Sequence, residues 1–463
     1  MGKMKKYYII LVLIVIYISG AYLLSLDESN KYSKFIKDNT PIKFKSIVKE
    51  TLFFIPYSKR EIKKLDLIAQ KLSEDNRILI LERDKYKNLL NSGSTKREKI
   101  NYNNYEFSST VIPFNDTLDL FANKKNGYIE IYKEHIIIFF ASGKIIFVNK
   151  NKFYKGEFDY FIVKSNLNQN KLFNQKLKWT GIKDIVVVED DLFISLTDEI
   201  TGNCYITSIY KSKISKTFMN FKKIFRPNEC FSTDKEIKAF KYFDGYQTGG
   251  RIVTNKNKLY VTLGDYNYWK EVQSNKSYSG KILEINKDTD EVKIISKGHR
   301  NPQGLLVLND QNLLISTEHG PKGGDEINVI KLSREKIQNF GWPISSYGNH
   351  YDVVPINSYV RNFAPLHKSH KKYGFIEPLK YYEKSIGISE IIKNHHHPNS
   401  FFVTSLKKKS IFEIELDKNL NFKRTRNIIE INERIRDIIY DKQKKCYLIY
   451  GENTPKLISM CLI

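Results

Sequence analysis

The stretch GHRNPQGL, residues 298–305, concentrates polar side chains that can bind oxygen atoms. His299, Arg300, Asn301 and Gln303 surround a proline that fixes the backbone, and none of these four is typical of a hydrophobic core. A guanidinium and two carboxamides supply several N–H donors at one place. We therefore expect this loop to face an anionic, oxygen-rich ligand.

A second loop, STEHGPKGGDEIN at residues 316–328, offers oxygen atoms instead. Its Gly320–Pro321 pair can aim backbone carbonyls out of a turn, while Asp325 and Glu326 supply carboxylates. Carbonyl and carboxylate oxygens are hard ligands, which suit Ca²⁺ and Mg²⁺. The loop is therefore a candidate cation site.

Two segments near the C-terminus carry cations. TSLKKKSIF (404–412) places Lys407 after a predicted strand, and ERIRDII (433–439) alternates Arg434 with Arg436. Residues two apart in a strand share a face, so both guanidiniums point the same way, and arginine binds carboxylates as a planar fork. The pair indicates an anionic partner. A charged, solvated strand edge is the alternative.

The fourth segment, residues 246–265, begins with YQTGGRIV and ends with LYVTLGD. The paired Gly249 and Gly250 let the backbone turn tightly or approach a ligand closely, and Arg251 follows at once. Asp265 ends the next predicted strand. This segment therefore joins the other three as a candidate ligand-binding loop.

The elements that position these loops are short strands. From about residue 105 to residue 463, runs such as HIIIFFA, DIVVVE and KLYVTLGD follow one another at close intervals, separated by Asn, Lys, Asp and Gly. No helical pattern separates them, which predicts an all-β domain. The span is too long for one sandwich, whereas four-stranded propeller blades take about 40–50 residues each. The pattern favours a β-propeller over residues 105–463.

The N-terminal quarter has a different texture. Residues 7–26 are uncharged and long enough to cross a bilayer as a helix, so residues 1–26 are interpreted as a cytoplasmic tip and a transmembrane anchor. A cleaved signal peptide is the alternative. Either way the remainder is exported, to the periplasm or the extracellular side. Residues 27–104 are predicted to hold a basic juxtamembrane segment, a helical stalk over 58–91 and a linker over 91–104.

The formal net charge of +25 raises the question of a nucleic-acid partner. The lysines are scattered along the chain, and no zinc finger, RNP-like motif or helix-turn-helix signature accompanies them. We therefore interpret the charge as compositional bias and expect no nucleic-acid partner.

Four cysteines acquire meaning in an exported chain, because an oxidising compartment permits disulfides. Cys204 and Cys230 are close enough in sequence for a bridge, with two buried free thiols as the alternative. Cys446 and Cys461 lie near the end of the chain. No CxxC or Cys/His spacing typical of zinc is present.

The loop motifs occur in one order that resembles a known family. GGRIV with LYVTLGD, SGKILEIN, GHRNPQGL, EHGPKGGDEINVI, NFGWP, SLKKKSIF and RIRD together are similar to the soluble quinoprotein glucose dehydrogenase and aldose (glucose/sorbosone) dehydrogenase family. The similarity covers roughly residues 125–463. It implies a six-bladed β-propeller that holds pyrroloquinoline quinone (PQQ) at the top of its central axis, beside Ca²⁺.

The resemblance also implies which residues hold the cofactor. In the family, the arginine and asparagine of the RNPQG loop contact the quinone end, where the arginine also polarises the reacting carbonyl. The lysine of SLK and both arginines of RxRD pair with the cofactor's carboxylates. Carried over to this sequence, the cofactor-binding residues are Arg300, Asn301, the adjacent Gln303, Lys407, Arg434 and Arg436.

Calcium ligands follow from the same resemblance. The family's Gly-Pro turn binds the Ca²⁺ beside PQQ through backbone carbonyls, which here belong to Gly320 and Pro321. Asp325 and Glu326 are candidates for a second calcium site because they add carboxylates to the same loop.

One position departs from the family pattern. The family's general base is a histidine four residues before the arginine of Gly-Gly-Arg, and Gln247 stands there in this chain. A carboxamide cannot take up a proton near neutral pH, although the aspartate that supports the histidine is retained as Asp265. Another residue could serve as the base, and Asp244, His299 and His319 are candidates.

These expectations lead to two functions. The first is a membrane-anchored, PQQ-dependent dehydrogenase that oxidises a sugar or alcohol hydroxyl and passes electrons to a quinone or a cytochrome at the membrane. The second is a non-catalytic propeller that has kept only binding, because of Gln247.

Overall fold

A computed structural model describes residues 98–102, 105–112, 126–167, 172, 180–234, 243–333, 336–352, 354 and 356–463. The predicted transmembrane segment and the predicted stalk helix lie outside these residues. Within the described ranges, no helix combines the length and the apolar character that crossing a bilayer requires. The chain divides into two compact units, Met1–Ser94 and Thr95–Ile463, and the second contains all the described residues.

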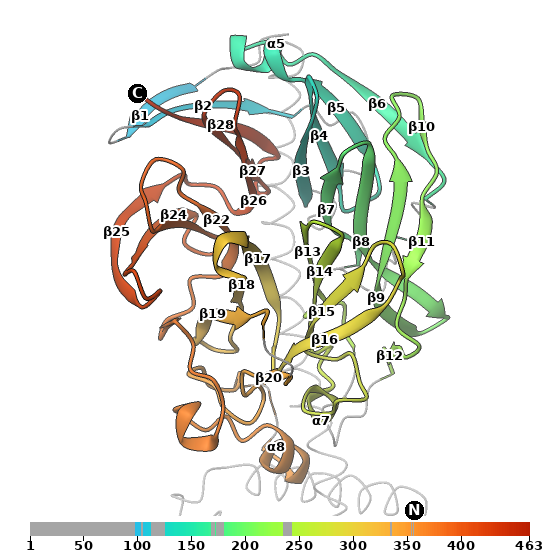
Figure 1. Ribbon diagram of the computed structural model, residues 1–463, viewed down its shortest axis with the longest axis vertical. Coiled ribbons are helices and arrows are strands. Elements are labelled where there is room, and N and C mark those ends of the chain that lie inside the picture. Colours follow the sequence, from blue (N-terminus) through green and yellow to red (C-terminus); the bar gives the residue numbers. More distant parts are fainter. Residues whose placement is uncertain are drawn as a thin grey trace, which may run out of the picture. The chain divides into compact units, whose positions relative to one another are not determined.

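Six antiparallel sheets make up the second unit, which confirms the predicted six-bladed β-propeller (Figure 1). Blade 1 consists of β3 (Gly127–Tyr132), β4 (His135–Phe140), β5 (Ile145–Asn149) and β6 (Tyr160–Ser165), with β10 (Phe218–Met219) parallel to β6. Blade 2 consists of β7 (Gly181–Val188), β8 (Asp191–Thr201), β9 (Cys204–Lys213) and β11 (Lys222–Phe225), with β12 (Phe231–Ser232) also on β9. Blade 3 consists of β13 (Gly249–Asn255), β14 (Lys258–Leu263), β15 (Lys281–Asn286) and β16 (Val292–Lys297), with β20 (Gln338–Asn339) on β16.

The last three blades continue the pattern. Blade 4 consists of β17 (Pro302–Leu308), β18 (Leu313–Glu318), β19 (Asp325–Lys331) and β21 (Lys380–Tyr382). Blade 5 consists of β22 (Ile388–Lys393), β23 (Ser400–Ser405), β24 (Ser410–Leu416) and β25 (Phe422–Glu430). Blade 6 consists of β26 (Ile435–Asp441), β27 (Cys446–Gly451), β28 (Lys456–Leu462), β2 (Tyr105–Val111) and β1 (Glu98–Tyr102).

Blade 6 closes the ring by joining the two ends of the propeller. Strand β2 pairs antiparallel with β28 from Tyr105↔Leu462 to Val111↔Lys456, so the blue and red ribbons of Figure 1 lie side by side. Strand β1 then pairs with β2. Part of the predicted linker 91–104 is therefore a strand. Pairing with β2 makes residues 98–102 extended, although their sequence lacks the β-rich pattern of the other strands.

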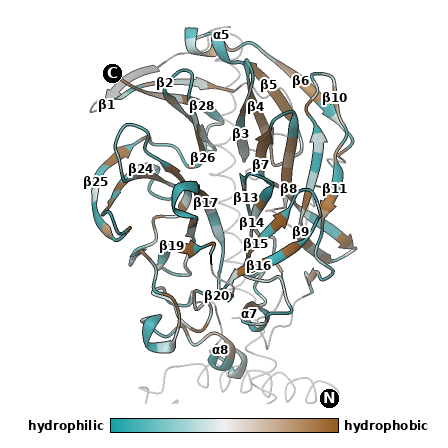
Figure 2. Ribbon diagram, in the orientation of Figure 1, coloured by the Kyte–Doolittle hydropathy of each residue, from teal (hydrophilic) through white to brown (hydrophobic). Residues whose placement is uncertain are grey.

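Each blade is buried on both faces, because its neighbours cover it. This explains continuous apolar runs such as HIIIFF in β4, where five of six residues are buried. A separate cluster of buried hydrophobic residues fills each of the interfaces between consecutive blades, including the one between blade 6 and blade 1. Figure 2 shows the hydrophobic residues along strands such as β5 and β8, and hydrophilic residues on α5 and α8.

Short helices occupy some of the connections. They are α5 (Lys150–Lys155), α7 (Trp269–Val272) and α8 (Ser358–Phe363), together with the 3₁₀ turns η2 (Asn309–Gln311) and η3 (Lys371–Tyr373). Helix α5 begins at an Asn149 cap whose side chain accepts from Lys152 N, and it ends at Gly156, which has a positive φ.

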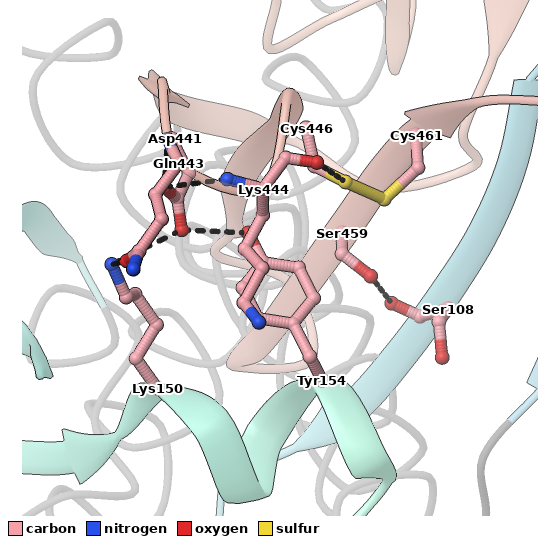
Figure 3. Close-up of a disulfide and its surroundings, with 9 residues drawn as sticks. All are labelled: Ser108, Lys150, Tyr154, Asp441, Gln443, Lys444, Cys446, Ser459 and Cys461. Atoms are coloured by element: carbon pink, nitrogen blue, oxygen red, sulfur yellow. Dashed lines mark hydrogen bonds and ion pairs between the residues drawn. A yellow bond between two sulfur atoms is a disulfide. The ribbon is translucent and has the colours of Figure 1, made fainter.

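Both pairs of cysteines form disulfides. The bridge between Cys204 and Cys230 is the one expected, whereas Cys446–Cys461, between directly opposed residues of β27 and β28, was not expected (Figure 3). Beside the second bridge, Lys150 of α5 donates to Gln443 Oε1 (2.9 Å), so blade 1 contacts the β26–β27 turn of the closing blade.

Candidate functional site

A cavity of about 560 Å³ lies at the end of the propeller axis where the innermost strands of all six blades begin. Its wall contains residues from the start of β3, β7, β17 and β26 and from the loops before β13 and β22. The structure brings most of the predicted site residues to this wall. Those lining the cavity are Gln247, Arg300, Asn301, Gln303, Gly320, Pro321, Lys407, Arg434 and Arg436.

The GHRNPQGL loop is more buried than expected. His299 is fully buried and Arg300 is 8% exposed, because neighbouring blades cover the loop at the axis. The expectation that none of it resembles core was therefore wrong for these two residues. Burying a polar atom costs free energy unless the atom forms a hydrogen bond, and most polar atoms of this loop have hydrogen-bond partners.

A single carboxylate orients the two predicted arginines. Glu452 accepts from Arg434 Nε and from Arg436 Nε, each at 2.7 Å, with one oxygen for each. Glu452 is 6% exposed, and Arg436 is buried with it, whereas Arg434 is one-third exposed. Both arginines line the cavity, where Arg436 Nη1 also donates to Gln303 Oε1 (3.2 Å).

Amides continue this network along the wall. Gln303 Nε2 donates to Asn301 Oδ1 (3.1 Å), and the same oxygen accepts from the backbone of Gly249 (3.2 Å). The RNPQG loop is thus tied to the Gly-Gly-Arg loop on one side and to Arg436 on the other. This rigid connection is what pre-organised ligand binding requires.

Arg300 is fixed by carbonyls and by an aromatic ring. Its Nη1 donates to Gly320 O (2.8 Å) and to His319 O (3.1 Å), and its guanidinium lies 5.4 Å from the Trp342 ring centroid. Trp342 in turn donates its Nε1 hydrogen to Asp265 Oδ2 (2.7 Å). Asp265 itself is fully buried behind the wall and does not line the cavity.

Gln247 occupies the corner between Asp265 and Arg300. One end of its carboxamide lies 2.6 Å from Asp265 Oδ1, and the other lies 3.2 Å from Arg300 Nη2 and 2.7 Å from the Asn267 carboxamide. Because a guanidinium can only donate, we assign the Gln247 oxygen to the Arg300 side and its nitrogen to the Asp265 side, and the Asn267 amide nitrogen then donates to the Gln247 oxygen. Gln247 thus rests on the supporting aspartate but has no basic atom.

A glycine permits this close arrangement. A side chain on Gly264 would lie 1.9 Å from the carbonyl oxygen of Gln247, so only glycine fits where β14 meets the loop. Gln247 itself has a φ of 59°, in the left-handed region, which non-glycine residues seldom adopt outside functional or constrained sites.

Ionisation in and behind the cavity is strongly perturbed by burial. Burial raises the pKa of Asp265 to about 7, although Arg300 and the N–H donors of Asn267 and Trp342 oppose the shift. Burial lowers the pKa of His319 to about 4, with Arg300 adding to the effect. The pKa of Lys183, on the cavity wall, is lowered to about 7, first by burial and then by Arg436. Groups near neutrality at a concave site are typical of functional centres.

Asp325 and Glu326 are placed behind the wall rather than in it. Asp325 is fully buried, and its oxygens accept hydrogen bonds from Gly320 N, from Ser385 Oγ and from the backbone of residues 386–388. Glu326 Oε1 lies 3.3 Å from His370 Nε2. Among the described residues no three His, Cys, Asp or Glu side chains gather around a metal position, so the geometry does not favour a second calcium site built by these two carboxylates.

The other histidine candidates differ in access. His299 is fully buried outside the cavity, with Nε2 2.8 Å from Ser296 Oγ and its ring stacked on Phe340. His319 lines the cavity.

Sequence reasoning missed several residues of the site. Glu452 and Asn267 connect the predicted residues, and Lys183 adds a cation from β7. The sequence around each of these residues contains no ligand-binding motif. They could not be predicted, because only folding places them beside the motif residues. Further aromatic side chains of the wall are Tyr128, Tyr246, Trp269, Trp342 and Tyr351.

Fold and site together define a class, namely a six-bladed propeller with a cationic, hydrogen-bonding cavity on its axis. The sequence model described as Glucose / Sorbosone dehydrogenase matches residues 180–459, and the chain belongs to this family.

Curated relatives agree with this assignment. The chain is 27% identical over 260 residues to the aldose sugar dehydrogenase YliI of Escherichia coli (strain K12), an alignment that covers 52% of this chain and 64% of that protein. It is 31% identical over 128 residues to quinoprotein glucose dehydrogenase B of Acinetobacter calcoaceticus, covering 21% of this chain and 26% of that one. The chain thus matches less than two thirds of the length of these relatives.

Solved structures share the fold. The soluble aldose sugar dehydrogenase of Escherichia coli in the apo form superposes with a TM-score of 0.58 at 19% identity, covering 77% of this chain and 100% of that one. The PQQ-bound aldose sugar dehydrogenase of Streptomyces coelicolor gives a TM-score of 0.54 at 15% identity, covering 76% and 98%. At these identities the likeness is one of fold.

Proposed function

We propose that the chain is a PQQ-dependent dehydrogenase that oxidises a hydroxyl group of a sugar or alcohol. The observation that carries the proposal is the charge of the axial cavity, where cationic side chains come from separate blades and Asp244 is the one carboxylate among the described residues of the wall, with Glu452 behind it paired to two of the cations. A tricarboxylate such as PQQ complements this arrangement. The cations are Lys183, Arg300, Lys407, Arg434 and Arg436.

The cavity suits this cofactor in size and in available donors. Its volume of about 560 Å³ lies within the range of roughly 300–1,000 Å³ common for small-molecule sites. Among the described residues, no side-chain hydrogen bond or ion pair engages the Lys407 ammonium, and Arg434 is one-third exposed. These cations are available to pair with a ligand's carboxylates.

PQQ, when bound, supplies a quinone that accepts two electrons from the substrate. Arg300 and Asn301 would orient the quinone end, while Lys407, Arg434 and Arg436 would fix the carboxylates. The carbonyls of Gly320 and Pro321 would hold Ca²⁺. Each carbonyl accepts one hydrogen bond here, from Arg300 and from the Tyr351 hydroxyl respectively, and keeps a second lone pair for a cation.

A second candidate function is binding without catalysis. Gln247 favours it, because the family's base position holds an amide that rests on Asp265 but cannot take up a proton. Such a propeller would hold an anionic ligand in the same cavity.

The test mixes the purified full-length protein with PQQ and Ca²⁺, records the absorption of bound PQQ, and measures dye reduction with a panel of aldoses and alcohols. Binding together with dye reduction is the expected result. Binding without dye reduction would favour the second candidate, and the absence of both would reject PQQ as the ligand.

We also propose that residues 7–26 anchor the protein in a membrane, with the propeller exported and electrons passed to a quinone or a cytochrome there. The uncharged run flanked by lysines supports this. Full-length protein should sediment with membranes and resist high salt, while a chain lacking residues 1–26 should stay in the supernatant. Equal distribution of the two would contradict an anchor.

A further inference from the structure

Oxidation of a hydroxyl requires a group that takes up the hydroxyl proton, and this chain lacks the histidine that resemblance to its family predicts. Gln247 holds that position, and an amide has no usable pKa. The question rests on the proposed function, and the cavity wall restricts the candidates to a few ionisable groups.

Asp244 is the only carboxylate among the described residues that line the cavity. It lies three residues before Gln247, in the loop that leads into β13, where its Oδ1 accepts from Tyr246 N (3.2 Å). The side chain of Asn267 lies between Asp244 and Gln247 and contacts both. A single side chain therefore separates the Asp244 carboxylate from the position where the family keeps its base.

Its surroundings make Asp244 a better base than an exposed aspartate. Burial raises its pKa, while the Tyr246 N–H, Asn267 and the charge of Arg300 limit the rise. The other charged group that interacts with it is Asp265, whose own carboxyl Asp244 repels. A raised carboxyl pKa strengthens proton uptake, yet this carboxyl can still ionise in the accessible pH range.

The competing groups are less suitable. His299 is fully buried outside the cavity. His319 lines the cavity directly before Gly320 and Pro321, whose carbonyls are proposed to hold Ca²⁺, so a proton taken up there would place a second positive charge beside the cation. Lys183 packs against Gly250 and is repelled by Arg436, at the end of the cavity assigned to the cofactor's carboxylates rather than to the quinone. His350 has its Nε2 2.7 Å from Ala364 O and is thereby engaged.

We infer that Asp244 is the general base of this enzyme and replaces the family's histidine. In the step, the substrate's C–H bond breaks and its electron pair leaves as hydride to the quinone, while the O–H proton passes to the Asp244 carboxylate. A C=O double bond forms, so the substrate loses two electrons and two hydrogens. PQQ, when bound, would supply the acceptor for this hydride, and the Asp244 carboxyl would release its proton to solvent through the cavity mouth.

The test compares wild type, Asp244→Asn and Asp244→Glu as full-length proteins loaded with PQQ and Ca²⁺. Asp244→Asn should lower kcat by about 10²-fold or more with PQQ affinity changed less than about threefold, while Asp244→Glu should keep a larger share of kcat. In wild type kcat should rise as the pH passes upward through the Asp244 pKa, because only the ionised carboxylate accepts a proton. Asp352→Asn is the matched control, since Asp352 is an exposed carboxylate paired with Lys322 outside the cavity.

A measurement independent of turnover accompanies the kinetics. ¹³C NMR of protein labelled at its aspartate carboxyls should show several resonances that titrate above the ordinary aspartate range, because burial also raises the pKa values of Asp184 and Asp265 to about 7. The resonance that vanishes in Asp244→Asn should be one of them. Adding Gln247→His to Asp244→Asn should restore part of kcat, because a histidine then rests on Asp265.

The outcomes separate this inference from the proposed function. Wild type that turns over together with an equally active Asp244→Asn would overturn the inference alone. Loss of PQQ affinity in parallel with kcat would also overturn it, since Asp244 would then serve cofactor binding. Wild type that binds PQQ but never reduces dye would overturn both.

Discussion

At the scale of single residues, the site depends on side chains that hold other side chains. Glu452 is buried and shared by Arg434 and Arg436, which gives both guanidiniums one orientation. Without a ligand, the Glu452 carboxylate is the main negative charge that compensates the two arginines. The carboxylates of a bound ligand would add further negative charge beside them.

We predict that Glu452→Gln destabilises the protein without PQQ by about 3 kcal/mol, because breaking a buried ion pair leaves uncompensated charge. Bound PQQ should recover part of this loss through its carboxylates. The rise in Tm on adding PQQ should therefore be larger in the variant than in wild type, as measured by thermal unfolding.

Glu415→Gln is the control for this prediction. Glu415 also pairs with two cations, Lys423 and Arg424, but on the outer strands of blade 5, where both partners are more than half exposed. Its loss should cost much less stability than the loss of Glu452, because water screens an exposed ion pair, and it should leave the PQQ response unchanged. Equal PQQ responses in wild type and Glu452→Gln would contradict the proposed charge pairing.

The residues that contact a ligand were easier to predict than the residues that support them. Arg434 and Arg436 both reach Glu452, as their spacing predicted, although β26 begins only at Ile435, and the loop motifs identified Arg300 and Asn301. Glu452 was not predictable, since it follows a different strand and only the β26–β27 pairing brings it to the arginines. The surroundings of Asp325 were not predictable either, because its acceptance of backbone N–H groups depends on the segment before β22 folding against it.

At the scale of elements, the closing blade combines the two ends of the propeller. The sequence predicts its individual strands through β-rich runs such as CYLIYGE, and β27 indeed spans Cys446–Gly451. The pairing of β2 with β28 was not predictable, because it joins segments at opposite ends of the domain and no local pattern encodes it. The bridge between Cys446 and Cys461, which are only 15 residues apart, was missed for a different reason: the register that sets the two cysteines opposite each other in β27 and β28 cannot be read from the sequence.

We predict that the double variant Cys446→Ser, Cys461→Ser loses about 3 kcal/mol of unfolding free energy, since a cross-link over a separation of 15 residues restricts the unfolded chain by that amount. Urea denaturation with and without reductant measures the loss. Reductant should lower the stability of this variant further, because Cys204–Cys230 is still present. A variant as stable as oxidised wild type would contradict the prediction.

At the scale of the whole molecule, one side chain connects the blades. Arg251 of β13 forms ion pairs with Asp184 of β7 (2.9 Å), Glu390 of β22 (2.6 Å) and Asp437 of β26 (3.0 Å). It also donates to Gln303 O of β17 and lies 5.5 Å from the Tyr128 ring of β3. All six innermost strands therefore meet at this guanidinium, next to cavity residues.

The excess of carboxylates around one arginine has a consequence for stability. Burial raises the pKa of Asp184 and of Glu390 in spite of Arg251, and each carboxylate disfavours ionisation of the others. The folded protein consequently holds protons that the unfolded chain releases above its ordinary carboxyl pKa of about 4. Under that condition the free energy of unfolding falls as the pH rises.

We predict that the urea midpoint of the propeller decreases from pH 5 to pH 7, because the raised pKa values of Asp184, Glu390 and Asp265 together outweigh the opposite effect of His319, whose pKa is lowered to about 4. The predicted range stops at pH 7 because two buried lysines, Lys183 and Lys281, have the opposite effect above that pH. Their pKa values are lowered to about 7, so above pH 7 the folded protein binds fewer protons than the unfolded chain. Stability then rises with pH. Glu390→Gln, which imitates the protonated carboxyl, should reduce the slope. Asp191→Asn should not reduce it, because Asp191 lies in a surface pair whose lysines lower its pKa. A midpoint that rises steadily between pH 5 and pH 7 would show that Arg251 keeps the axial carboxylates ionised.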